Sequence, residues 1–125
     1  MKFSTFMVIY AVVSAVFGLG FVLMPGQLLP IYGVDPDAAL RLIGHFFGAA
    51  LLSLAILSWL ARNLSNSEAR RAIVLALFVG ETLGFIMALI GQLNGILNAL
   101  GWSVVVVYLV FALGLAYFQF SKPAS

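Results

Sequence analysis

Residues 75–91 read LALFVGETLGFIMALIG, an apolar run interrupted by one carboxylate, Glu81. A long apolar run of this kind is typical of a helix that crosses a bilayer. An ionised side chain near the centre of such a helix costs about 2.5 to 3.5 kcal/mol on insertion scales, so it usually faces a partner or a cavity. The stretch therefore predicts a membrane environment and makes Glu81 the first candidate functional residue.

The composition of the whole chain agrees with this environment. Of 125 residues, 64% are hydrophobic and 8% are charged, against roughly 25% charged residues in an average soluble domain. The net charge is +2, and the basic residues are scattered at the ends of the apolar runs instead of forming a patch, which argues against a nucleic-acid partner. Cysteine is absent, which excludes disulfides, thiolate metal sites and dithiol redox chemistry.

Four apolar runs are long enough to cross a hydrocarbon core of about 30 Å as helices. We place them at Phe3 to Met24, Ala38 to Leu60, Ala72 to Leu93 and Trp102 to Phe120. Because backbone groups in lipid must satisfy their own hydrogen bonds, helices are the expected form. The predicted fold is all-α: an integral membrane four-helix bundle that forms a single domain over residues 1–125.

Helix-ending and helix-starting residues support these limits. Pro25 and Gly26 end the first run, and residues 35–37 (Asp-Pro-Asp) introduce the second. Ser65 and Glu68 have capping-box spacing ahead of the third. Lys122 and Pro123 are expected to close the fourth. The first run is also longer than the 7 to 15 residues or so of a signal-peptide core and lacks a small-residue cleavage site, so we expect it to be retained.

The basic residues predict the orientation. Five lie on one side of the predicted bilayer and only Arg41 lies on the other; the five are Lys2, Arg62, Arg70, Arg71 and Lys122. By the positive-inside rule both termini are then cytoplasmic. The expected location is a bacterial inner membrane, with the lipid bilayer as the first partner.

The two outer loops differ. Residues 94–101 are short and turn-like, whereas residues 25–37 contain three prolines among apolar residues. We expect this longer segment to lie in the interface or to fold back onto the bundle. The letters Gly-Gln-Leu occur at residues 26–28 and again at 91–93, which is compatible with two tandem helical hairpins or with coincidence.

Several stretches together resemble a known group of proteins. They are IYGV at 31–34, RLIGHFFGAALLSLAILSWLAR at 41–62, ARRAIVLAL at 69–77 and GQLNGILNALGW at 91–102. The chain resembles small bacterial four-helix membrane proteins of the DoxX-like group, notably in the RxxG opening at Arg41 and Gly44 and in the turn from Asn98 to Trp102. The resemblance implies a four-helix bundle in a bacterial inner membrane and implies no mechanism.

The depth of the polar residues suggests a pair. At roughly 1.5 Å per helical residue, Glu81 lies about 14 Å from the cytoplasmic side and His45 about 12 Å from the outer side, so they are at similar depth in a core of about 30 Å. Arg41 shares a helix face with His45. The glycines at 44, 48, 80 and 84 have the spacing that permits close helix contact. We therefore predict a tight contact between the second and third helices, with a ligand or proton site that contains Glu81, His45 and Arg41 along it.

Other polar groups lie at similar depth and complete the candidate site: Tyr10, Ser14 and Tyr108. The alternative for each is a hydrogen bond to a neighbouring backbone carbonyl. For Glu81 and His45 the alternatives are a purely structural pair or a Glu81 without a partner. We expect no catalytic, cofactor or metal residues, because the sequence has no HExxH, no phosphate-binding glycine loop and only one His.

Three functions stay open. The first is an accessory or assembly subunit of a larger membrane complex or a homo-oligomer, suggested by small loops and by aromatic residues that we expect on exposed faces, at positions 46, 47, 78, 85 and 111. The second is a lipid- or small-molecule-binding protein or transporter that uses the Glu81 and His45 site. The third is a membrane enzyme that uses the same residues as acid and base. It has the least support, because no nucleophile or cofactor motif accompanies them.

Overall fold

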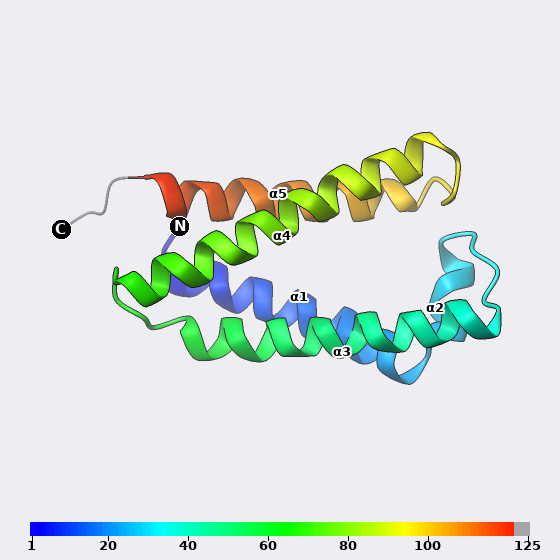
Figure 1. The fold of residues 1–125 in the computed structure, drawn as a ribbon, viewed down its shortest axis with the longest axis horizontal. Helices are drawn as coiled ribbons and strands as arrows, with labels where there is room; N and C mark the ends of the chain where they lie inside the picture. Colours follow the sequence, from blue (N-terminus) through cyan, green and yellow to red (C-terminus); the bar gives the residue numbers. More distant parts are fainter. Residues whose placement is uncertain (122–125) are drawn as a thin grey trace. The chain divides into compact units, whose positions relative to one another are not determined.

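The computed structural model describes residues 1–121, and within that range every regular element is a helix. The helices are α1 (Phe3–Leu23), α2 (Pro25–Ile31), α3 (Ala38–Ala61), α4 (Glu68–Leu93) and α5 (Gly101–Phe120) (Figure 1). The prediction of an all-α chain is confirmed, and three of the four long helices have limits within one residue of those expected. The short α2 was not predicted as a helix.

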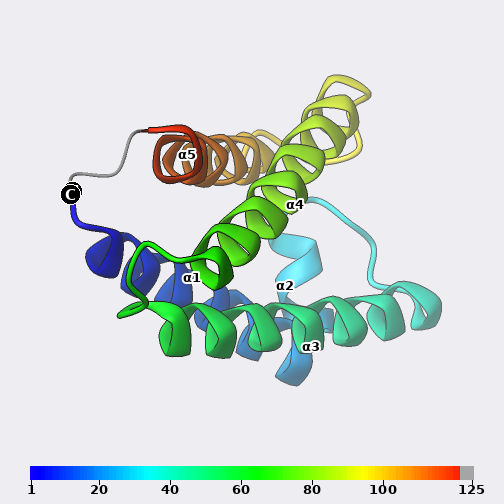
Figure 2. The same cartoon turned by 60° about the vertical axis from the view of Figure 1, so that its left-hand side comes forward.

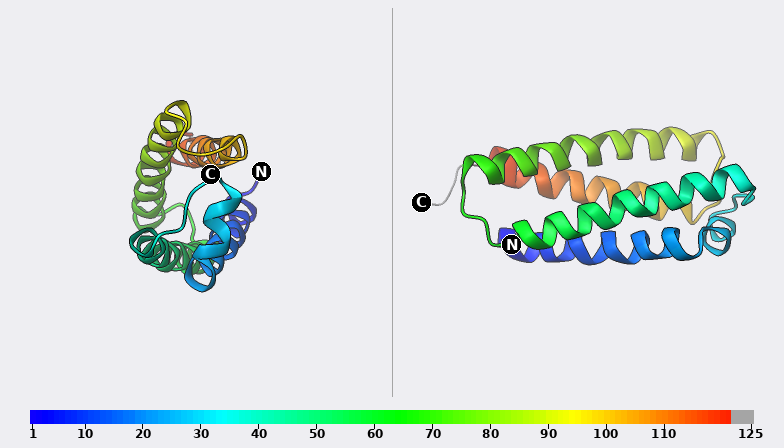
Figure 3. Two further views of the ribbon diagram at one scale, coloured as in Figure 1. Left: turned by 90° about the vertical axis from the view of Figure 1, so that its right-hand side faces the viewer. Right: turned by 60° about the horizontal axis from the view of Figure 1, so that its bottom comes forward.

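The chain divides into two compact units, Met1–Asn63 and a second that begins at Leu64. In the first unit, α1 and α3 lie side by side and antiparallel, and α2 lies where the chain turns from one to the other (Figures 1 and 2). In the second unit, α4 and α5 form an antiparallel hairpin (Figure 3). Each unit is thus a helical hairpin, the arrangement with which the repeated Gly-Gln-Leu letters were compatible.

The first hairpin contains a break between α1 and α2. The amide of Met24 still bonds to the carbonyl of Gly20 at 2.8 Å, but Pro25 has no N–H and begins α2. The helix then packs against both α1 and α3, and a side chain added at Gly20 would meet Leu28. Residues 25–31 therefore fold back onto the hairpin, one of the two arrangements predicted for this apolar segment.

Side-chain caps define where α3 and α4 begin. Asp37 accepts a hydrogen bond of 2.8 Å from the amide of Leu40, as expected for a helix N-terminus. The cap of α4 is Ser67, which accepts from Arg70 N at 3.2 Å. The predicted cap, Ser65, is wrong, and α4 begins at Glu68 instead of Ala72 because Ser67 supplies the oxygen at the right position. Lys122 and Pro123, predicted to close the last helix, lie outside the described residues.

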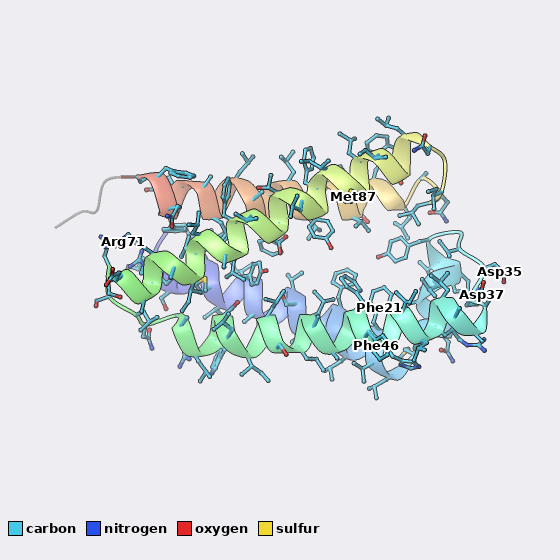
Figure 4. The ribbon with its side chains drawn as sticks, in the orientation of Figure 1. Phe21, Asp35, Asp37, Phe46, Arg71 and Met87 are labelled. Atoms are coloured by element: carbon cyan, nitrogen blue, oxygen red, sulfur yellow. The ribbon has the colours of Figure 1, made fainter. Side chains whose placement is uncertain are left out.

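Much of the surface of the long helices is apolar and exposed. Phe46 on α3 is 65% exposed and Met87 on α4 is 64% exposed (Figure 4). Among the described residues, four helices are long and apolar enough to span a bilayer, and so much exposed apolar surface is unusual for a protein in water. A multi-pass membrane protein accounts for both observations.

The aromatic residues expected on exposed faces behave differently from one another. Phe46 and Phe47 are exposed as predicted, but Phe111 is only 7% exposed, so its prediction is wrong. The ring of Phe47 packs edge-on against Phe21 within the first hairpin, and that of Phe78 packs edge-on against Phe120 within the second. Spacing along a helix did not reveal these contacts because they depend on the neighbouring helix.

Candidate functional site

The two helices of the first hairpin meet where glycine removes the side chain. A Cβ added at Gly48 of α3 would lie 2.6 Å from the backbone nitrogen of Val22 and 2.8 Å from the carbonyl oxygen of Gly18, both on α1. Gly44, one turn earlier, would place a Cβ 3.1 Å from Pro25. The glycines of α3 therefore allow direct backbone contact with α1. From their spacing we predicted contact with the helix that carries Glu81 instead.

His45 lies between these two glycines and binds α1. Its Nδ1 atom is 2.8 Å from the carbonyl oxygen of Val22, which lies in the last turn of α1. Because a carbonyl oxygen only accepts, Nδ1 carries the hydrogen and Nε2 is the other nitrogen of an exposed ring. The last carbonyl groups of a helix have no donor within the helix. The Nδ1–H group of His45 supplies a donor to one of these carbonyls, that of Val22. This contact gives His45 a structural role in the first hairpin.

Arg41, one turn before His45, binds a different part of the same hairpin. Its guanidinium donates to the carbonyl oxygen of Pro36 at 2.9 Å, and a Cβ added at Gly26 would lie 3.4 Å from its Cδ. Arg41 thus connects α3 to the segment that precedes it and lies against α2. The side chains of Arg41 and His45 both bind backbone carbonyls.

Tyr10 and Ser14 lie on the buried stripe of α1. Tyr10 is 1% exposed and Ser14 is 6% exposed, and the two are one helical turn apart. Both side chains are therefore buried on the same side of α1, and their place in the predicted site stays a prediction.

Glu81 lies on the buried stripe of α4 and is only 9% exposed. In the second hairpin it is close enough to Tyr108 of α5 for the two side chains to interact electrostatically. One turn further along α4, a Cβ added at Gly84 would overlap the ring of Tyr108. Two of the six predicted site residues, Glu81 and Tyr108, are therefore brought together by the packing of α4 on α5.

The side chain beside Glu81 adds polarity at this level of α4. The hydroxyl oxygen of Thr82 is buried and makes no hydrogen bond within the described part of the chain. Among residues 1–121, no group of three or more His, Asp or Glu side chains could hold a metal ion. The chemistry offered here is that of a single carboxyl with hydroxyl groups near it.

His45 and Glu81 belong to different hairpins, and their pairing stays a prediction. Within its own hairpin, each has a neighbour. Sequence reasoning did not find the neighbour of His45, but it did place the neighbour of Glu81 in the same candidate site. For His45 it is the backbone oxygen of Val22. For Glu81 it is Tyr108.

A polar cluster that sequence reasoning missed closes the second hairpin. Gln92, 8% exposed at the end of α4, donates from Nε2 to the carbonyl oxygen of Asn98 at 3.0 Å. The amide of Gly101 donates to the same oxygen at 2.9 Å. A Cβ added at Gly101 would overlap the Oε1 atom of Gln92, so Gln92 packs directly against this glycine. The available signal was a glutamine in an otherwise apolar helix end, noted only as part of the repeated letters.

Comparison with known proteins identifies the family. Residues 1–120 match the family model described as Domain of unknown function (DUF8292). The chain belongs to this family. No curated protein and no solved structure matches the chain significantly. The family carries no assigned activity, and the DoxX-like resemblance stays a prediction.

Proposed function

We propose that this DUF8292 member is a bacterial inner-membrane protein that binds a lipid or small molecule through Glu81. The observation that carries the proposal is the burial of Glu81 on the apolar helix α4, next to Tyr108. A carboxyl group at such a place is costly to keep, and such residues commonly mark ligand, ion or proton pathways. A ligand with a cationic or hydrogen-bond-donating group would complement it.

The orientation that goes with this proposal places both termini in the cytoplasm. Its support is the charge bias of the sequence, in which Arg41 alone among six basic residues falls on the outer side. The six-residue connection from Arg62 to Ser67 between α3 and α4 would then be cytoplasmic, and α2 would lie at the outer surface.

An acid–base enzyme is the least supported alternative. The Nδ1 atom of His45 is already bonded to the carbonyl oxygen of Val22, so only Nε2 is left for proton transfer. An accessory subunit is a better second candidate. The exposed side chains on the long helices include Phe46 and Met87, and these apolar faces offer a large area for contact with other membrane helices.

Purification in a mild detergent followed by native mass spectrometry tests the proposal. We expect the wild-type protein to carry a bound molecule and Glu81→Gln to lose it while staying folded, because glutamine keeps the shape but not the charge. Glu68→Gln is the matched control: the same change on the same helix, at an exposed carboxylate in the first turn.

Two results would contradict the proposal. If the purified wild-type protein carries no bound molecule, the proposal that Glu81 binds a ligand is contradicted. Co-purifying membrane proteins that persist in Glu81→Gln would instead favour the accessory subunit.

A further inference from the structure

The helices α4 and α5 are in close contact on the face of α4 that carries Glu81. Glu81 and Gly84 are three residues apart, so their Cα–Cβ directions lie on the same side of α4. The missing side chain of Gly84 leaves the space that the ring of Tyr108 occupies: a Cβ there would overlap three of its carbon atoms, Cε1, Cδ1 and Cζ. The ring therefore lies directly over the helical turn that joins Gly84 to Glu81.

The other glycines of α4 show that this space is specific. A Cβ added at Gly80 or at Gly91 would meet no atom within 4 Å. Glycine is thus required by packing at position 84 and not at these two positions. Glycine costs about 1 kcal/mol relative to alanine inside a helix. The packing of the Tyr108 ring against α4, which a side chain at position 84 would block, explains why glycine is found there.

The position of this ring matters because of its polar end. Tyr108 is half-buried, and its ring lies against the turn of α4 that carries Glu81, where the two side chains are close enough to interact electrostatically. A tyrosine in an apolar setting usually directs its O–H to a polar partner. Glu81 is the buried carboxyl on this turn of α4, whereas Tyr117, on the same helix as Tyr108, is 59% exposed.

We propose that Tyr108 is the positioning residue for the Glu81 carboxyl and that the absence of a side chain at Gly84 provides the space for the Tyr108 ring. This inference rests on the proposed function, in which Glu81 binds the ligand, and adds the residues that hold the carboxyl in place. Tyr108 acts through Glu81: its hydroxyl orients the carboxyl in the second hairpin, and its ring fixes the distance between α4 and α5.

Two measurements on Glu81 itself test the inference without any knowledge of the ligand. The first is the rate at which dicyclohexylcarbodiimide, an apolar reagent for protonated carboxyl groups, labels Glu81 in the full chain in lipid nanodiscs. The second is the infrared carbonyl band of Glu81, obtained by subtracting the spectrum of Glu81→Gln. Both respond to the partner of the carboxyl and not to the overall stability of the fold.

Tyr108→Phe removes one oxygen atom and keeps the ring in the space at Gly84. We expect it to change the labelling rate of Glu81 by roughly tenfold, the scale of one hydrogen-bonding interaction with a charged group, and to shift the carbonyl band. Tyr117→Phe makes the same change on the exposed face and should leave both measurements as in the wild type.

Gly84→Ala tests the second half of the inference. The added methyl group should displace the ring and reproduce the spectral shift of Tyr108→Phe, whereas Gly80→Ala should have no effect. If Gly84→Ala fails to fold, Tyr108→Phe still decides the role of the hydroxyl.

The possible failures are distinguishable. If Tyr108→Phe and Gly84→Ala both leave the labelling rate and the carbonyl band unchanged, the inference is overturned even when ligand binding depends on Glu81. If no ligand is found but Tyr108→Phe shifts the band, the proposed function fails and the positioning role of Tyr108 stands.

Discussion

The Nδ1 atom of His45 lies 2.8 Å from the carbonyl oxygen of Val22, so the ring of a residue on α3 binds the last turn of α1. Pro25 interrupts the chain three residues later and begins α2. The hydrogen bond therefore fixes α3 against the helix break, and the break determines where α2 begins. His45 stabilises a bend in the backbone, whatever its Nε2 atom does in addition.

Substitution of His45 should reveal which nitrogen matters. Asparagine places an N–H donor close to the position of Nδ1, whereas glutamine places one close to Nε2. We expect His45→Asn to retain most of the free energy of unfolding and His45→Leu to lose about 1 to 3 kcal/mol, because the Val22 carbonyl would lose its donor. Denaturant unfolding in detergent micelles measures the difference. If glutamine substitutes well and asparagine does not, the assignment of Nδ1 is wrong.

Gly48 should tolerate no side chain. An alanine Cβ would lie 2.6 Å from the nitrogen of Val22, a backbone atom that cannot rotate away, so we expect Gly48→Ala to cost about 1 to 3 kcal/mol of stability. Gly91→Ala is the control, because a Cβ there meets nothing within 4 Å. It should be neutral or stabilise by up to about 1 kcal/mol through helix propensity. Equal effects from both variants would contradict the backbone contact.

The part of the fold that could be predicted follows from features that are local in sequence. The long helices were predictable because the apolar runs match the thickness of a bilayer and because Asp37 caps a helix with its own side chain. The burial of Glu81 was predictable from the cost of a charge in lipid. The helix α2 was missed because it has seven residues and contains Pro30, which argues against a helix.

The partners of the site residues could not be predicted in the same way. The partner of His45 is a backbone carbonyl, which has no letter of its own in the sequence. That Tyr108 lies near Glu81 depends on the register of α5 against α4, in which the ring of Tyr108 occupies the space at Gly84. Both facts depend on packing between helices, which helical spacing alone does not determine.

Gln92 offers a test in which two effects oppose each other. Leucine at this position removes the hydrogen bond to Asn98 but also removes the Oε1 atom, which is buried without a hydrogen-bond partner in the described range. We therefore expect Gln92→Leu to stay within about 1 kcal/mol of the wild type. Gln92→Glu should cost more than about 2 kcal/mol, because it buries a charge and removes the donor.

Gln27→Glu supplies the matched control for Gln92→Glu. Gln27 is exposed on α2, so the same exchange there should change the unfolding free energy by less than about 0.5 kcal/mol. A similar loss at both positions would show that Gln92 is not held in a buried cluster.

The proposed orientation can be measured in cells. Reporter fusions at Ser125 should be active in the cytoplasm, and fusions at Asp35 should be active outside, because five of the six basic residues fall on the side of the termini. Adding two lysines next to Asp35 should weaken this preference, since the orientation follows the distribution of basic residues. A periplasmic signal from the Ser125 fusion would reverse the proposed topology.

The docking of α2 onto the first hairpin should protect it from proteases. Leu28 fills the space over Gly20, and we expect cleavage within residues 25–37 to be slow in the purified protein in nanodiscs. Leu28→Asp should speed cleavage by about tenfold, because a half-buried leucine contributes roughly 1.5 kcal/mol and cleavage follows the population of the open form. Gln27→Asp, at the exposed neighbour, should leave the rate unchanged. Rapid cleavage of the wild-type protein would mean that α2 is not held against α1 and α3.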